Sequence, residues 1–418
     1  MAIFLFVTLL ILLLFQVGVA FFSKDKRQLW SPTVFLSVYL MYYIIVPFLK
    51  GGGIASESAQ VYLLFGAILF YIIFQVAFLF IPTRYSFPKV NALVNENNAF
   101  TVAIVLFVLA FIGNGLFNGF GLSVLSSSSR EDIFFDDEGS YGHTQMYITY
   151  LISLFAFSCS LVYVAKKKIT PLLLVLAIIS LAIYIIGGFR YRILIFAVVF
   201  VVVYYLYPYA RRVNIIAVLP IAIVLYLLMG VIENTRMYGQ GLDLEALTEI
   251  RESGEVKAAR ENVLVYEFSA ECMKRYDVDD FLLFEPAFNA LCSPLPRSIF
   301  PWKPKGTYMR DANIRIYGTI AHGSAFLNIT EAYVSFGWFG IILYALFLGW
   351  LSRVFWTNYL ANSGSVGAIV LLALYNGTLY QIIARGYMAQ ALTTFLYYVV
   401  IPFLLVMLYN FVMRLVKQ

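Results

Sequence analysis

The sequence predicts an all-α polytopic membrane protein with about eleven transmembrane helices and one large extracytoplasmic loop. Hydrophobic residues make up 62% of the 418-residue chain and charged residues only 12%, whereas soluble domains average about 45–50% and about 25%. The apolar residues come in runs of about twenty, enough for a helix to cross about 30 Å of hydrocarbon. The runs do not alternate as the strands of a membrane barrel do, and helices satisfy their own backbone groups in lipid.

The expected spans fall into two groups around the loop. Residues 1–232 hold the first eight helices, 233–324 form the large loop, and 325–418 hold the last three helices. The first run has no basic cluster ahead of it and is longer than a signal-peptide core, which favours a retained helix. In order, the spans are residues 2–22, 29–49, 60–81, 99–119, 145–165, 170–187, 193–208, 213–232, 325–351, 365–384 and 387–413.

Basic residues occur in every second connection between these runs, which is the positive-inside pattern of membrane proteins. The pattern places those connections and the C-terminus in the cytoplasm and the N-terminus outside. It also explains the net charge of +6, so this charge does not indicate a nucleic-acid partner. The residues are Lys24, Lys26, Arg27, Arg84, Lys89, Lys166, Lys167, Lys168, Arg211, Arg212, Arg353, Arg414 and Lys417.

The connections on the other side differ in charge and length. The fourth, from Ser126 to Glu138, is acidic, and the eighth, residues 233–324, is the one long connection in this prediction. Helix-like stretches near Leu242–Arg260 and Val263–Arg275 indicate a small folded cap. Because long loops on a rigid scaffold commonly carry function, we expect the functional site on this side.

Several arginines lie on this outer side, where the positive-inside rule disfavours them. Arg190 and Arg192 follow Gly187-Gly188 between two helices, Arg385 joins two others, and Arg236 begins the long loop. Each side chain could simply snorkel to lipid phosphates or pair with the acidic connection. As a set, they favour a phosphate or diphosphate ligand at the outer surface, because a guanidinium forks onto phosphate oxygens. A polyprenyl diphosphate fits, since its tail needs lipid and its head needs cations.

The second half of the loop is rich in proline and basic residues between Ser293 and Lys305. Prolines fix the backbone and remove amide donors, so this segment is expected to be rigid and irregular. Lys303 either binds substrate or only helps to hold this rigid segment across the loop. Arg297 is a candidate ligand for a diphosphate or a sugar acid.

One of the chain's two histidines, His322, stands just before the ninth predicted helix, and Glu331 and Tyr333 follow inside that helix. An acid within a membrane helix usually pairs with a cation or takes part in chemistry. A histidine can deprotonate a sugar hydroxyl, although a single histidine is often structural. We expect His322 and Glu331 to be catalytic and Tyr333 to line a sugar site.

The loop also holds an acid-x-acid spacing in Asp277–Asp280 and two cysteines, Cys272 and Cys292. The acidic residues resemble the metal-binding spacing of soluble sugar transferases but occur freely in solvated loops, so we expect no metal. The cysteines could pair in an oxidising compartment; free thiols are the prediction, because spacing alone does not establish proximity.

The stretch from Pro296 to Gly340 resembles bacterial oligosaccharide repeat-unit polymerases of the Wzy type. His322–Gly340 is also similar to a motif of O-antigen ligases, where the pattern is closer to His-Asn; here Gly323 follows the histidine. Gly188-Phe189-Arg190 resembles the arginine-bearing helix junction of both groups, and together the motifs cover about a quarter of the chain. The polymerase motif residues are Pro296, Arg297, Pro301, Lys303, Pro304, Glu331, Tyr333, Phe336, Gly337 and Gly340.

This resemblance implies a membrane glycosyltransferase with a GT-C-like fold in the bacterial inner membrane, with its site facing the exterior. It would polymerise undecaprenyl-diphosphate-linked oligosaccharide repeat units into surface polysaccharide without a cofactor, since the lipid diphosphate is itself the leaving group. A chain-length regulator and a flippase are possible partners. Two alternatives stay open at this point: a ligase that moves the polymer to another acceptor, and a flippase for the same lipid-linked unit. The long outer loop with its histidine argues against the flippase, which should have short loops on both sides.

Overall fold

The computed structural model describes residues 1–51, 53, 55–82, 86–118, 150–186, 190–213, 236–237, 241–242, 261–295, 300–304, 308–318, 325–384 and 386–416. Within these ranges the chain is almost entirely helical. The β structure described there is one antiparallel pair, β1 (Arg236–Met237) with β2 (Gly241–Leu242). The predicted all-α class is therefore confirmed for the described residues.

Seven helices in the described residues are long and apolar enough to cross a membrane. Three more are apolar but shorter: α9 (Leu154–Lys166, preceded by η4, Tyr150–Ser153), α10 (Pro171–Ile186) and α11 (Arg190–Leu206). The seven are α1 (Ala2–Phe22); α2 (Pro32–Leu40) with η2 (Met41–Ile45) and α3 (Val46–Leu49); α4 (Glu57–Phe80); α6 (Glu96–Asn118); α17 (Asn328–Ala361); α18 (Val366–Ala384); and α19 (Met388–Phe395) with η6 (Leu396–Val400) and α20 (Ile401–Val416).

Helices thus lie at ten of the eleven predicted spans. The remaining span, 213–232, falls almost wholly outside the described residues, so the number eleven and the GT-C-like fold stay predictions. Local sequence explains several helix starts. Pro32 and Pro171 each open a helix, where a missing amide hydrogen costs nothing. Ser56 caps α4 by accepting a hydrogen bond from the Ala59 amide.

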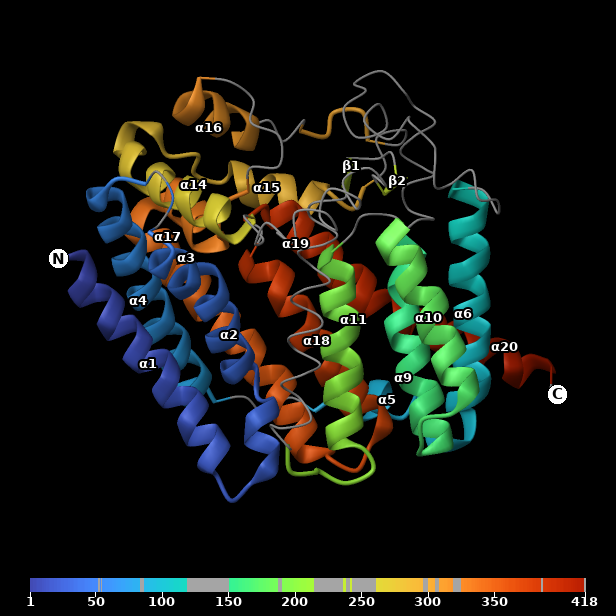
Figure 1. The fold of residues 1–418 in the computed structure, drawn as a ribbon. Helices are drawn as coiled ribbons and strands as arrows, with labels where there is room; N and C mark the ends of the chain where they lie inside the picture. The colour runs from blue at the N-terminus through green and yellow to red at the C-terminus, as the bar shows by residue number, and fades with distance from the viewer. Residues whose placement is uncertain are drawn as a thin grey trace, which may run out of the picture.

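The long helices run along one common direction, and the described part of the predicted loop lies across one end of them (Figure 1). This part contains α14 (Glu261–Arg275), η5 (Val278–Asp280), α15 (Glu285–Cys292) and α16 (Tyr308–Tyr317). We call this end the cap end. The helix predicted near 263–275 is confirmed as α14, whereas the stretch predicted from 242 to 260 lies largely outside the described residues.

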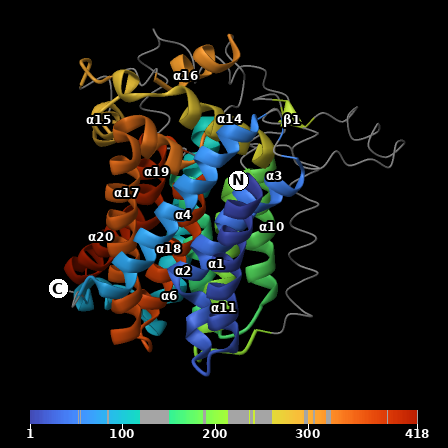
Figure 2. The ribbon, with the colours of Figure 1, turned by 90° about the vertical axis from the view of Figure 1, so that its left-hand side faces the viewer.

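The connections at 23–31, 167–170 and 207–213 lie at the opposite end of the bundle (Figures 1 and 2). They carry most of the described residues of the positive-inside pattern: Lys24, Lys26, Arg27, Lys167, Lys168, Arg211 and Arg212. The alternation of charge along the sequence therefore corresponds to two ends of one helical bundle.

Helix α18 lies at the centre of the bundle. In its most apolar window 94% of the residues are buried, against 28% in α1. It packs against α2, α11, α17 and α19. On this central helix, Asn376 Nδ2 donates to the Trp30 carbonyl at 2.9 Å. The outward apolar residues of α1, α4, α6, α10 and α20 remain exposed, as expected for a bundle surrounded by lipid.

Helix α17 is broken near the cap end. Phe336 and Gly337 have non-helical backbone angles, and Gly337 has a φ of +61°, which glycine adopts without strain. The amides of Leu282 and Leu283 donate to the carbonyls of Val334 and Ser335 at 2.8 and 2.9 Å. The break therefore frees two carbonyls, and the segment between η5 and α15 satisfies them.

Candidate functional site

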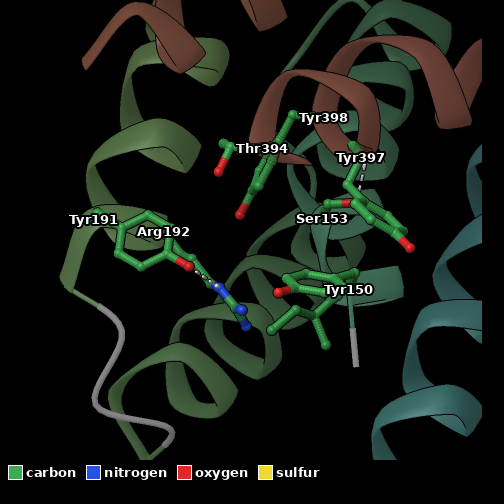
Figure 3. A pocket seen from close by; sticks show the side chains of 8 residues that line it. Tyr150, Ser153, Tyr191, Arg192, Thr394, Tyr397 and Tyr398 are labelled. Carbon is green, nitrogen blue, oxygen red and sulfur yellow. Dashed lines mark hydrogen bonds between the residues drawn. The ribbon is translucent and has the colours of Figure 1, made fainter. Parts of the chain in front are cut away.

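One buried cation lies at the cap end, beside a small cavity between η4, α11, α19 and η6 (Figure 3). Arg192 is only 5% exposed. Its Nε donates to the Tyr191 hydroxyl at 3.2 Å, and its guanidinium carbon lies 5.6 Å from the centre of that ring. The cavity is small, about 10 Å³, which is room for about one water molecule. It is lined by Tyr150, Ile152, Ser153, Tyr191, Arg192, Thr394, Tyr397 and Tyr398.

Tyrosines surround this guanidinium on several sides. Figure 3 shows the hydroxyls of Tyr150 and Tyr398 directed toward Arg192, whereas the hydroxyl of Tyr397 points away. Tyr397 instead stacks on Tyr150, with ring centres 4.5 Å apart, and its carbonyl accepts a hydrogen bond from Ser153 Oγ at 2.8 Å. These contacts join η4 to η6. The result is a permanently charged fork donor among hydroxyl groups, which suits a phosphate-bearing head group.

A buried carboxyl lies at the same end of the bundle, where α16, α17 and α19 meet. Glu331 is fully buried. Its Oε1 accepts a hydrogen bond from the Tyr308 hydroxyl and another from the Met388 amide at 2.8 Å. Its Oε2 has no hydrogen-bond partner among the described residues. A carboxyl oxygen in such a place is costly unless something else meets it, so Oε2 is available to a ligand or to another group.

Tyr308 ties the cap to this carboxyl. It comes from α16 and is 2% exposed, and its ring lies 5.7 Å from that of Tyr387, centre to centre. Burial raises the pKa of Tyr308 well above its ordinary value, and the nearby Glu331 raises it further. Its hydroxyl therefore stays protonated at neutral pH and remains a donor to Glu331.

Glycine allows close approach of two chain segments beside Glu331. The Gly386 amide donates to the Phe326 carbonyl, and a Cβ at Gly386 would lie 2.6 Å from the Leu327 carbonyl oxygen. Phe326 and Leu327 directly precede α17, and Gly386 directly precedes the turn into α19. The chain that leaves α18 is thus held against the chain that enters α17.

Three of the predicted site residues, His322, Arg297 and Arg385, lie outside the described residues. His322 lies three residues before Ala325, and Arg385 directly precedes Gly386, so the described flanks of these two residues meet at the Gly386–Phe326 hydrogen bond. Arg190 begins α11, two residues before Arg192. Convergence of these side chains remains a prediction.

The other predicted residues have defined surroundings or a defined backbone. Lys303 Nζ donates to the carbonyls of Ser293 and Leu295 at 2.6 and 3.1 Å, so it braces the proline-rich segment. The ring of Tyr333 packs edge-on against Trp338, with centres 4.9 Å apart. Arg236 lies in β1. Substrate binding by Lys303, Tyr333 and Arg236 stays a prediction.

The acidic and cysteine residues of the loop also have described positions. Arg315 of α16 forms an ion pair with Asp280, and this hydrogen bond holds the pKa of Asp280 below its ordinary value. Cys159, Cys272 and Cys292 are all free and buried, as predicted for the loop pair. Burial raises the pKa of the Cys272 thiol, which disfavours the reactive thiolate.

Sequence reasoning did not identify the partners of Arg192 and Glu331. Tyr308 lies 23 residues before Glu331, and Tyr150, Tyr397 and Tyr398 lie about 40 and 200 residues from Arg192 along the chain, so no local pattern marks these pairs. Tyr191 is the exception, because it directly precedes Arg192 in the sequence. That adjacency and the tyrosine pair Tyr397-Tyr398 were the available signals.

A single helical segment connects the two positions. The Met388 amide meets Glu331 at the start of α19, and Tyr398 of η6 lines the cavity of Arg192. Ten residues of helix separate them, or about 15 Å at the usual rise per residue. Comparisons with protein-family models, with curated proteins and with solved structures find no match for this chain.

Proposed function

We propose that this chain is a membrane glycosyltransferase that polymerises undecaprenyl-diphosphate-linked oligosaccharide repeat units. It would act in the bacterial inner membrane, with the cap end and the N-terminus outside and the basic connections and the C-terminus in the cytoplasm. The observation that carries the proposal is the burial of Arg192 beside a cavity at the cap end. A permanent cation there suits the head group of a ligand whose tail remains in lipid.

The reaction would transfer the growing chain to the non-reducing end of a new lipid-linked unit. A hydroxyl of the acceptor sugar attacks the anomeric carbon of the donor, and the bond from that carbon to the diphosphate oxygen breaks. His322 accepts the hydroxyl proton. Arg190, Arg192 and Arg385, with Arg236 and Arg297, stabilise the charge that develops on the departing lipid diphosphate.

The carboxyl of Glu331 would orient a cation or a substrate group through its Oε2, which meets no described partner. Tyr308 and the Met388 amide hold the other oxygen and so fix the direction of Oε2. Tyr333 would line the sugar site, and Lys303 would keep the proline-rich segment beside it. The lipid diphosphate is the leaving group, so neither a nucleotide nor a metal is required.

A reaction with one kind of substrate distinguishes this function from its alternatives. Lipid-linked units extracted from cells that lack this gene are offered to the purified protein in lipid nanodiscs, with no other acceptor. We expect products that differ by whole repeat units, together with released undecaprenyl diphosphate. If the units are not elongated but transfer occurs once a different acceptor is added, the protein is a ligase. Absence of any transfer, with movement of the unit across proteoliposomes, would indicate a flippase.

Substitutions test the assigned residues in cells. His322→Ala and Arg190→Ala should each shorten the surface polymer to one or a few units, measured by gel electrophoresis of the extracted polysaccharide. Protein levels in the membrane are compared by immunoblot. Normal long chains from both variants at normal protein levels would refute the assignment.

A further inference from the structure

The short helix α15 in the cap exposes an apolar stripe. Phe288 and Leu291 of this helix and Phe284 just before it are 50%, 70% and 73% exposed. Spacings of four and three residues put them on one side of the helix. Pro286 and Ala290 are buried on the other side, where α15 packs against α19 and α17.

A tryptophan from the proline-rich segment joins this stripe. Trp302 is 61% exposed and stacks with Phe288, the ring centres being 6.5 Å apart. Phe300 meets Trp302 edge-on at 5.8 Å. We call Phe284, Phe288, Leu291 and Trp302 the aromatic patch. Large aromatic side chains exposed together on one surface usually mark an interaction site.

The aromatic patch continues onto a membrane helix. Phe284 packs edge-on against Phe336, with ring centres 4.9 Å apart, at the break in α17. Beyond the break, α17 exposes Phe339, Leu343 and Phe347, which lie four residues apart on one face of the helix. Figures 1 and 2 show α15 running across the upper ends of α17 and α19 at the edge of the bundle. The patch is therefore the upper continuation of a surface that faces lipid.

We propose that the aromatic patch lies in the head-group and acyl boundary of the membrane, and that α15 is an interfacial helix that anchors the cap. Aromatic residues concentrate at this depth because a ring prefers the acyl boundary while polar groups stay hydrated. A helix lying in the membrane plane with one apolar side gains from burying that side in lipid. The anchor needs no assumption about the reaction that the protein performs.

Spin labels can locate the patch relative to lipid and water. Cysteine is introduced singly at Leu291, at Phe347 as a lipid-facing reference, and at Ile314, which is 41% exposed. Ile314 belongs to α16, the described cap helix drawn farthest from the bundle in Figure 1. The native cysteines are buried, so the unsubstituted protein gives the background. Each nanodisc holds one copy of the spin-labelled protein. Electron paramagnetic resonance then measures how strongly each label is relaxed by oxygen, which concentrates in lipid, and by a water-soluble nickel chelate.

The label at Leu291 should be relaxed several-fold more by oxygen than by nickel, as at Phe347, while Ile314 should show the reverse. If the label at Leu291 were relaxed more by nickel than by oxygen, as expected at Ile314, the patch would face water or sugar. That result would overturn the anchor. Shielding of Leu291 from both relaxants would mean that protein covers it, which also overturns the proposal. As a second readout, brominated lipids should quench a larger fraction of the tryptophan fluorescence in the wild type than in Trp302→Phe. Equal fractional quenching in the two proteins would contradict the anchor.

Discussion

Two of the buried charged side chains at the cap end, Arg192 and Glu331, differ in what surrounds them. Arg192 borders a cavity, and tyrosine side chains from separate segments line it. Glu331 lies in a closed junction, where a hydroxyl from the cap and a backbone amide both meet one oxygen. Backbone hydrogen bonds reinforce the junction on either side, at Gly386 and at Leu282–Leu283.

In the proposed function, the first place binds the head group and the second positions the cap. The cavity beside Arg192 has room for only about one water molecule, so a head group would bind there after the lining side chains move apart. A closed junction ties the cap to α17 and α19, so a change there should alter the cap and the start of α19 together. Because α19 and η6 run from Glu331 to the cavity of Arg192, the junction should also set the shape of that cavity.

The largest effect should come from closing the space at the junction. Gly386→Val places a Cβ against the carbonyl oxygens of Phe326 and Leu327, which must then separate. We expect a loss of about 3 kcal/mol, the upper range for overpacking, and a marked fall in folded protein. The measurement is the melting temperature in detergent with size-exclusion recovery.

The matched control is Gly364→Val, where a Cβ would meet no atom within 4 Å. Its melting temperature should stay near that of the wild type. If Gly386→Val melted at the same temperature as Gly364→Val, the junction would not be closed as described.

The next largest effect concerns the charge of Glu331 rather than its packing. Glu331→Gln keeps an oxygen that can accept from Tyr308 and from the Met388 amide, so the fold should persist. If Oε2 serves the proposed transfer, the rate of elongation should fall about 100-fold, the lower range for loss of an acid–base group. Elongation of lipid-linked units by the purified variant is the measurement.

Glu271→Gln provides the comparison, because Glu271 is also buried and accepts from the Ser56 amide at 2.9 Å, but has no part in the proposed site. It should elongate at the wild-type rate. A Glu331→Gln variant as active as Glu271→Gln would leave Glu331 with a purely structural role.

Tyr308→Phe removes the hydroxyl that joins α16 to the junction. Loss of this hydrogen bond should cost about 1.5 kcal/mol of stability, seen as faster proteolysis of the cap. In the Glu331→Gln background the cost should shrink, since the partner is then uncharged. An equal cost in both backgrounds would show that Tyr308 acts through packing alone.

The smallest effect lies in the exposed pair of Asp280 and Arg315. Because the Arg315 hydrogen bond lowers the pKa of Asp280, the pair stabilises the protein above the ordinary pKa of 3.8, and that contribution is lost as the pH falls through the lowered value. Melting temperatures of the wild type and Arg315→Gln should differ slightly at pH 6, and the difference should shrink as the pH falls below 3.8. A gap that widened on acidification would contradict this pairing.

Composition and charge alternation predicted most of the fold because lipid imposes them on every membrane helix. The length of an apolar run locates a helix, and the positions of Lys24 and Lys167 indicate an end of the bundle. The same reasoning marked Glu331 as notable, since acids are rare in such runs. It placed the end of α17 at 351 rather than Ala361, and gave no break at Phe336–Gly337. That break depends on amides from residues 282–283, which are distant in the chain.

The surroundings of the site were less predictable for a related reason. Arg192 was identified by its unusual place among the charges, but its neighbours Tyr150 and Tyr398 depend on how η4 and η6 lie beside α11. Tertiary packing of that kind leaves no periodic signal in a single sequence. Likewise, the Lys303 side chain looked available for substrate, whereas its described hydrogen bonds go to carbonyls of its own loop.

Binding of undecaprenyl diphosphate, without any sugar, tests the central claim most directly. Its dissociation constant is measured by native mass spectrometry for the wild type, Arg192→Gln, Arg192→Lys and the surface control Arg315→Gln, with uncharged undecaprenol as the reference ligand. We expect Arg192→Gln to bind at least about tenfold more weakly, a loss of about 1.4 kcal/mol, with Arg192→Lys between it and the wild type. Arg315→Gln and undecaprenol binding should be unchanged. Equal diphosphate affinity in all four folded proteins would contradict the assignment of Arg192 as a ligand of the diphosphate.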